Sequence, residues 1–294
     1  MSWRIGDVTV TRVVETELAF PPEAVVVGLS ADDVIDIDWM RPLFCTEQGD
    51  IKLSFHAFVV RTPTLTVIVD TCFGEGRIPA ARATSPQPRP FLENLEAAGV
   101  RCEDVDVVLC THLHVDHVGW NTRDEGGAWV PTFANARYLF AADEFESLKA
   151  RSQAGDPHAA CFDVSVRPPY DAGLVELIEP SEGLPVCDEL TLIPTPGHTP
   201  GHVSVRIASR GAEAVITGDV LHTPFQFARP DMHGTFDGDG PLASLTRRAF
   251  FERFADSGSL ILGTHFPAPT AGHIVRDGRA WAFRALAADE RSDA

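Results

Sequence analysis

The sequence predicts a mixed α/β domain. Three observations support this: recurring strand-like runs, helical segments between some of them, and the lack of any repeat or linker that would divide the chain. Short apolar runs rich in Val and Ile recur along the chain, and most of them close with Gly, Pro or Asp, as strands do. The runs are FHAFVV (55–60), LTVIVD (65–70), VDVVLC (105–110), ARYLF (136–140), LTLIP (190–194), HVSVRI (202–207), AVITGD (214–219) and LILGTH (260–265). Helical segments are expected between some of them. No internal repeat, Ser/Gly linker or low-complexity run divides the chain.

The remaining elements follow from the same patterns. Residues 1–17 predict a first strand, because valine and isoleucine recur there among polar neighbours. Residues 90–100 repeat apolar side chains at helical spacing and end at a glycine, as does 241–258, and 141–152 is the third helical candidate. In the last helix, one face is expected to collect the apolar residues Leu242, Leu245, Ala249, Phe250 and Phe254.

Three irregular segments, 15–50, 74–90 and 221–240, are long enough to matter for function. Long ordered loops in a compact domain are often lids or pocket walls. We therefore expect a single domain over residues 1–294, with an N-terminal loop extension at about 15–50.

Composition restricts the function classes. The chain has 24 basic and 42 acidic residues, a net charge of -18, which disfavours nucleic-acid binding because that requires a basic surface. No stretch approaches the roughly 20 apolar residues that span a bilayer, and residues 1–17 lack the basic and apolar segments of a secretion signal. The six cysteines show no CxxC spacing, so buried thiols are expected rather than disulfides. These features predict a cytoplasmic protein with no membrane partner.

The stretch THLHVDHVGW (111–120) carries the strongest chemical signal. His112, His114, Asp116 and His117 directly follow the apolar run 105–110. Imidazole nitrogens and carboxylate oxygens suit zinc and similar divalent ions. His112 and His114 can point the same way and grip one ion, while Asp116 and His117 turn toward a second. Two ions need more ligands than these four.

Further ligand-type residues stand at other strand ends. PTPGHTPGH (194–202) offers His198 and His202 after a strand, VITGD closes with Asp219, and LILGTH closes with His265. The Asp219 carboxylate is able to bridge two ions. Each candidate lies just past an apolar run, as a site built on one rim of a sheet requires.

These motifs, HxHxDH, PGHTPGH, TGD and GTH in this order, resemble the metallo-β-lactamase superfamily, from VIVDTCFG (67–74) to GTHFPAPTAGHI (263–274). The resemblance implies an αββα sandwich of two mixed β-sheets flanked by helices, with the site at one edge of the sheets. It also implies two groups of ligands and a bridge: His112, His114 and His198 on one ion, Asp116, His117 and His265 on the other, and Asp219 between them. Asp70 would orient the site through hydrogen bonds. His202 is expected to be structural, because the first histidine of PGHTPGH is the usual ligand.

The implied chemistry is metal-assisted hydrolysis. Two divalent ions roughly 3.5–4 Å apart can share a hydroxide and bring its pKa close to neutrality. Zinc is the first expectation for both ions, with manganese, cobalt or iron as alternatives. Asp116 is expected to accept the proton of the attacking water. His222 lies three residues after Asp219, where lactonases of the superfamily carry a tyrosine, and is expected to hydrogen-bond the oxyanion or leaving group.

The substrate is predicted less directly. GDVLHTPFQF (218–227) and the GTH segment resemble the lactonase and methyl-parathion-hydrolase-like branch, which implies hydrolysis of a lactone, ester or phosphotriester of a small, largely apolar molecule. Pocket walls are expected from four aromatic residues: Phe20, Trp120, Phe225 and Phe227. The same aromatics could instead belong to the core or to a dimer interface, and family habit suggests a homodimer.

Three alternatives stay open. A thioesterase or glyoxalase-II-like hydrolase would bind anionic thiol conjugates through basic residues, for which Arg77, Arg82 and Arg229 are the candidates. A mononuclear iron dioxygenase would use the first ion site only, and the complete second ligand set argues against it. A ligand-sensing protein without turnover would show degenerate ligands, and none of the motif positions is degenerate.

Overall fold

The computed structural model describes residues 1–74, 91–181 and 183–287. Arg77, Arg82 and nearly all of the predicted loop 74–90 lie outside the described residues. The chain forms two compact units. The first comprises Met1–Ser2, Asp7–Thr16 and Phe55–Glu179, and the second comprises Trp3–Gly6, Glu17–Ser54 and Pro180–Ala294.

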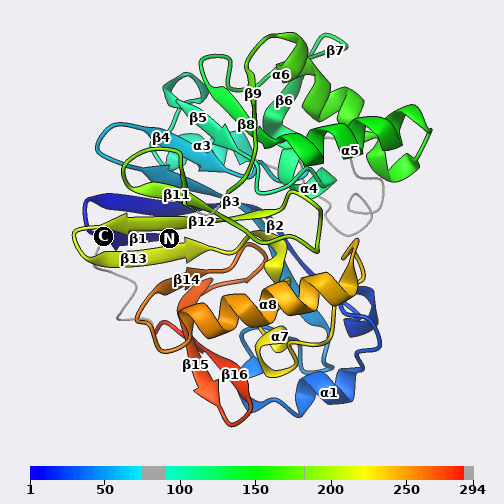
Figure 1. The fold of residues 1–294 in the computed structure, drawn as a ribbon, viewed down its shortest axis with the longest axis vertical. Helices are drawn as coiled ribbons and strands as arrows, with labels where there is room; N and C mark the ends of the chain where they lie inside the picture. The colour runs from blue at the N-terminus through cyan, green and yellow to red at the C-terminus, as the bar shows by residue number, and fades with distance from the viewer. Residues whose placement is uncertain (75–90, 182, 288–294) are drawn as a thin grey trace. The chain divides into compact units, whose positions relative to one another are not determined.

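Two seven-stranded sheets dominate the structure (Figure 1). The first contains, in spatial order, β1 (Ser2–Ile5), β2 (Val8–Phe20), β3 (Ile51–Arg61), β4 (Thr66–Val69), β5 (Val107–Leu109), β8 (Arg137–Ala141) and β9 (Val175–Ile178). The second runs through β10 (Leu184–Pro185), β11 (Leu190–Pro194), β12 (Val203–Ser209), β13 (Ala212–Ile216), β14 (Leu260–Leu262), β15 (Ala271–Asp277) and β16 (Ala280–Ala285). A separate hairpin pairs β6 (Thr122–Glu125) with β7 (Ala128–Pro131).

Helices flank these sheets. They are α1 (Ala31–Ile35), α3 (Phe91–Ala97), α4 (Val115–Val118), α5 (Ala142–Gln153), α6 (Arg167–Asp171), α7 (Phe225–Ala228) and α8 (Gly240–Phe254). Short 3-10 turns include η1 (Pro22–Ala24), η2 (Asp38–Met40), η4 (Gly119–Asn121) and η7 (Gly218–Val220). Two mixed sheets with flanking helices confirm the predicted fold class. Among the described residues, no helix is both long and apolar enough to cross a membrane.

The predicted elements are present, and their bounds differ in two places. All eight apolar runs fall on strands, and the three helical candidates correspond to α3, α5 and α8. The N-terminal strand, however, is split into β1 and β2 at Gly6, whose φ of 60° reverses the chain. The irregular segment predicted from residue 15 begins later, because β2 continues to Phe20, and it includes η1, α1 and η2.

Parallel strand pairs determine where polar residues emerge. In the first unit β4 and β5 are parallel, with Val69 opposite Leu109, so the residues after both strands leave the same sheet edge. In the second unit β13 and β14 are parallel, with Ile216 opposite Leu262. Asp219 therefore emerges beside the segment that follows β14.

A close backbone approach holds the loop after β4 against η4. The Thr71 amide donates to the His117 carbonyl at 2.8 Å, and the Gly119 amide donates to the Cys72 carbonyl at 2.7 Å. A Cβ on Gly119 would lie 1.8 Å from the carbonyl carbon of Phe73. Only glycine therefore fits at this position, although its φ of −57° suits any residue.

This packing predicts the effect of Gly119→Ala. The substitution should lower the free energy of unfolding by about 3 kcal/mol or more, because two backbone segments must separate to admit the methyl group. Gly126→Ala is the matched control: Gly126 has φ +66° and no neighbour within 4 Å of its Cβ position, so only about 1–2 kcal/mol of backbone strain is expected. Urea unfolding measures both variants, and equal losses would contradict the steric explanation.

Candidate metal centre

The first unit places four predicted ligands on one short segment. His112 and His114 lie between β5 and α4, and Asp116 and His117 lie in α4, whose N-cap is His114. The rings of His112 and His114 have centroids 4.6 Å apart, and those of His112 and His117 are 4.0 Å apart. His117 Nε2 lies 3.5 Å from Asp116 Oδ2. The loop after β5 therefore brings these four side chains into one cluster.

Asp70 determines how the His117 ring is presented. Its side chain is buried, and its φ of 60° turns the backbone directly after β4. Asp70 Oδ2 lies 2.9 Å from His117 Nδ1, and Oδ1 accepts the Thr111 amide hydrogen at 2.8 Å. Because a carboxylate accepts hydrogen bonds, His117 carries its proton on Nδ1 and keeps a lone pair on Nε2.

Thr111 fixes the position of the proton on His112 in the same way. Its hydroxyl lies 2.9 Å from Asp70 Oδ2 and donates its single hydrogen to that carboxylate. The hydroxyl oxygen can then accept from His112 Nδ1, which lies 3.1 Å away. His112 consequently also presents Nε2 as the nitrogen that bears the lone pair.

The second unit gathers three imidazoles around one carboxylate oxygen. Measured from Asp219 Oδ2, the Nε2 atoms of His265, His222 and His198 lie at 3.2, 3.4 and 3.5 Å. All four side chains are buried. Asp219 lies in η7 after β13, His265 follows β14, and His198 lies between β11 and β12. Ligand atoms of His198, Asp219 and His222 all fall within 4.8 Å of one another.

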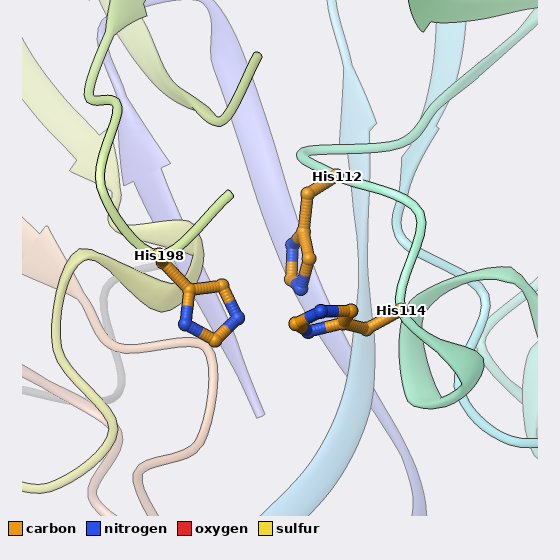
Figure 2. Close-up of side chains that lie close together, drawn as sticks. All are labelled: His112, His114 and His198. Carbon is orange, nitrogen blue, oxygen red and sulfur yellow. The ribbon is translucent and has the colours of Figure 1, made fainter. Parts of the chain in front are cut away.

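Oxygen acceptors orient two of these rings from behind. His265 Nδ1 lies 3.2 Å from the carbonyl oxygen of Ser54, and His198 Nδ1 lies 2.8 Å from Asp237 Oδ1. Figure 2 shows the His198 ring on the loop after β11 and the rings of His112 and His114 on the loop after β5. Both hydrogen bonds direct Nε2 away from the acceptor.

Burial and these bonds also affect protonation. Burial lowers the pKa of His198, although the hydrogen bond to Asp237 opposes the shift, and this favours the neutral imidazole that a metal ion requires. Burial alone would raise the pKa of Asp237. The hydrogen bond from His198 and the positive charge of Arg247 help to outweigh burial and hold that pKa well below its usual range. Asp237 is therefore a carboxylate.

His202 has a different role from His198, four residues earlier. Its Nε2 accepts the Asp219 amide hydrogen at 2.7 Å, and its Nδ1 lies 2.8 Å from Thr195 Oγ1. A Cβ on Gly218 would lie 2.5 Å from His202 Nε2, and φ at Gly218 is +55°. Both ring nitrogens of His202 are thus used in building the turn that carries Asp219.

The predicted aromatic wall is largely interior. Trp120 stacks on Phe91 with centroids 5.7 Å apart, and its indole N–H donates to Glu15 Oε1 at 2.7 Å. Phe227 stacks on Phe283 at 5.5 Å, and Phe225 is also buried. Phe20, at the end of β2, is partly exposed. The contacts of Trp120 and Phe227 are explained by packing within their own units.

Sequence reasoning missed two residues with buried side chains behind His198 in the second unit, Asp237 and Arg247. Arg247 lies in α8 with no exposed surface and donates to Asp237 Oδ2 at 3.2 Å. Neither residue belongs to a motif with recognisable spacing. One signal for Arg247 was available. Arg247 lies shortly before Phe250, Phe251 and Phe254 in the same predicted helix, and all three phenylalanines are buried.

Comparisons with known proteins agree with this geometry. The family model described as the metallo-β-lactamase superfamily matches residues 55–265. An N-acyl homoserine lactonase of Bacillus sp. is 27% identical over 157 residues, which cover 52% of this chain and 53% of the relative. The N-acyl homoserine lactonase of Bacillus cereus is 27% identical over 154 residues and covers the same shares. The chain thus spans about half the length of the curated relatives it matches.

Solved structures are similar over nearly the whole chain. The hydrolase AbOPH, described as belonging to the beta lactamase superfamily, has a TM-score of 0.80 at 25% identity and covers 97% of both chains. AidC, described as a dizinc quorum-quenching lactonase, has a TM-score of 0.77 at 17% identity and covers 98% of this chain and 97% of its own. With the matched segment running from β3 to His265 and the ligand-type histidines and aspartates at its strand ends, the chain belongs to the metallo-β-lactamase superfamily.

Proposed function

We propose that this protein is a dinuclear metal-dependent hydrolase that cleaves a lactone or related ester bond, or a phosphotriester, in a small, largely apolar substrate. One observation carries the proposal. His112, His117, His198 and His265 each have an oxygen acceptor within hydrogen-bond distance of Nδ1. Metal-binding histidines almost always bond an oxygen through the other ring nitrogen, so this arrangement supports four Nε2 ligands.

The donor set fits two divalent ions. We assign one ion to His112, His114 and His198. The other is assigned to Asp116, His117 and His265, with Asp219 bridging. Nitrogen and carboxylate donors without cysteine suit zinc first, and also manganese, cobalt or iron. The description of AidC as a dizinc enzyme supports zinc.

When bound, two such ions lower the pKa of a water molecule and polarise a carbonyl or phosphoryl oxygen. Asp116 is then placed to accept a proton from the attacking water, because its side chain is 19% exposed beside the buried His117. The other residues assigned to the two ions would bind the metal and orient the substrate.

His222 is assigned the role of a hydrogen-bond donor to the oxyanion or leaving group. Its side chain is buried, and neither ring nitrogen has a hydrogen-bond partner among the described residues, although Nε2 lies 3.4 Å from Asp219 Oδ2. A buried polar group without a partner calls for an explanation, and a substrate oxygen would supply one. Gly234 leaves room for the ring, since a Cβ there would lie 2.9 Å from His222 Nδ1.

The relatives support a substrate class. The curated relatives are N-acyl homoserine lactonases, and AidC is described as a lactonase. AbOPH is described only as a hydrolase. The net charge of -18 also favours neutral substrates over anionic ones. We therefore place lactones first, then aryl esters and phosphotriesters.

Metal content and hydrolysis test the proposal together. The purified chain should bind about two zinc ions, and chelation should abolish hydrolysis until metal is restored. A panel of N-acyl homoserine lactones, aryl esters, phosphotriesters and acyl thioesters identifies the bond cleaved. Asp219→Ala should lose at least about 10³-fold in kcat/KM, because both ions lose a ligand.

The control is His158→Gln, at an exposed histidine outside the cluster, which should keep both metal and activity. Full hydrolysis by Asp219→Ala or by the metal-free chain would contradict the mechanism. Preferred turnover of acyl thioesters would favour the thioesterase alternative.

A second prediction isolates His222. His222→Phe keeps an aromatic ring but removes the donor, so kcat should fall about 10²- to 10³-fold while both metal ions are retained. His273→Phe, at a partly buried histidine bonded to the Ser259 carbonyl, is the control and should leave kcat unchanged. A drop in bound metal for His222→Phe would show instead that His222 is a ligand.

A further inference from the structure

A completely buried carboxylate, Asp237, stands behind the His198 ring. Its Oδ1 lies 2.8 Å from His198 Nδ1. Its Oδ2 accepts the Gly234 amide hydrogen at 2.7 Å and a hydrogen from Arg247 Nη2 at 3.2 Å. Each oxygen of Asp237 is therefore committed, one to the histidine and one to the groups that hold the carboxylate in place.

Arg247 connects this carboxylate to the turn that carries Asp219. Its Nε donates to the Val220 carbonyl at 2.8 Å. Its Nη1 donates to the carbonyls of Pro230 and Met232 at 3.0 and 3.2 Å. A buried guanidinium is costly unless it is paired and hydrogen-bonded, and all three of its nitrogens are bonded here. One cation thus joins the segments 218–220, 230–232 and 237.

We propose that Asp237 and Arg247 are positioning residues that together set His198 and Asp219 for metal binding. Asp237 keeps the His198 proton on Nδ1, so that Nε2 presents its lone pair. Arg247 orients Asp237 and, through Val220, the residue next to Asp219. The inference rests on the proposed function, since it assigns a purpose to these bonds only if His198 and Asp219 are ligands.

A neighbouring pair provides a matched control. Arg248 and Asp231 form an ion pair of the same residue types, with side chains 41% and 71% exposed. Exposed ion pairs contribute little to stability. The side-chain bonds of this pair join Arg248 of α8 to Asp231 and reach no candidate ligand among the described residues. The two pairs differ mainly in burial and in the bond to His198.

The decisive variant is Asp237→Asn. An amide has one acceptor and one donor end, so it cannot accept from His198 Nδ1 and from Gly234 and Arg247 at the same time. Zinc affinity, measured by competition with a chromophoric chelator, should fall about 10- to 100-fold. Asp231→Asn should stay within about twofold of the unsubstituted chain, because surface charges act weakly.

A second measurement tests the positioning role of Asp237 in the metal-free protein. Long-range ¹H–¹⁵N NMR correlations on the metal-free protein report which nitrogen of His198 carries the proton. The unsubstituted chain should show the Nδ1–H form, and Asp237→Asn should shift His198 toward the Nε2–H form. A residue that only stabilised the fold would leave this tautomer unchanged in molecules that remain folded.

Arg247→Lys tests the other half of the inference. Lysine keeps the charge but cannot bond the Val220 carbonyl and Asp237 with the same planar geometry, so zinc affinity should again fall at least about tenfold. Arg248→Lys is its control and should have no effect. If Asp237→Asn fails to fold, the double variant Asp237→Asn/Arg247→Met removes both buried charges at once and should fold with the same loss of zinc affinity.

The outcomes separate this inference from the proposed function. Unchanged zinc affinity and an unchanged His198 tautomer in Asp237→Asn would overturn the inference while leaving the hydrolase intact. A chain that binds no zinc in its unsubstituted form would overturn the proposed function instead. In that case the tautomer measurement would still show whether Asp237 controls His198.

Discussion

The candidate metal centre depends on the hydrogen bonds that His112, His117, His198 and His265 make through Nδ1. A histidine ring has two nitrogens, and the acceptor behind one of them decides which lone pair the other presents. The acceptors are of three chemical kinds, namely the carboxylates of Asp70 and Asp237, the Thr111 hydroxyl and the Ser54 carbonyl. The Asp70, Thr111 and Asp237 side chains are buried, so water does not compete for these bonds.

The candidate ligands at strand ends could be predicted because their positions require only local information. An apolar run followed at once by polar residues marks the end of a buried strand, and parallel neighbours such as β13 and β14 end at the same sheet edge. Asp219 and His265 are therefore visible in the sequence, as is the group after β5. The order of motifs then identified the superfamily, and with it the two mixed sheets.

The residues that bond the candidate ligands from behind could not be predicted, because their contacts are with residues far away in the chain. Asp237 is 39 positions from His198, and its segment resembles any polar loop. The amphipathic pattern of α8 was misleading: Leu245 is 65% exposed, whereas Arg247 on another face is fully buried. Helical periodicity predicts that the most hydrophobic face of a helix is buried. A buried arginine that pairs with a carboxylate and several backbone carbonyls can bury another face instead. The contacts of Trp120 likewise depend on distant partners, since its ring stacks on Phe91 and its indole N–H donates to Glu15.

The two histidines of PGHTPGH show that residue type and spacing alone do not distinguish a candidate metal ligand from a structural histidine. Both are buried, both follow β11 and both have a bonded Nδ1. Their Nε2 atoms differ: that of His198 lies 3.5 Å from the Asp219 carboxylate, whereas that of His202 accepts the backbone hydrogen of the same residue. A nitrogen that accepts an amide hydrogen has no second lone pair for a metal ion. His202 therefore affects the site by holding the turn that carries Asp219. Gly218 permits this contact, because a Cβ at that position would lie 2.5 Å from His202 Nε2.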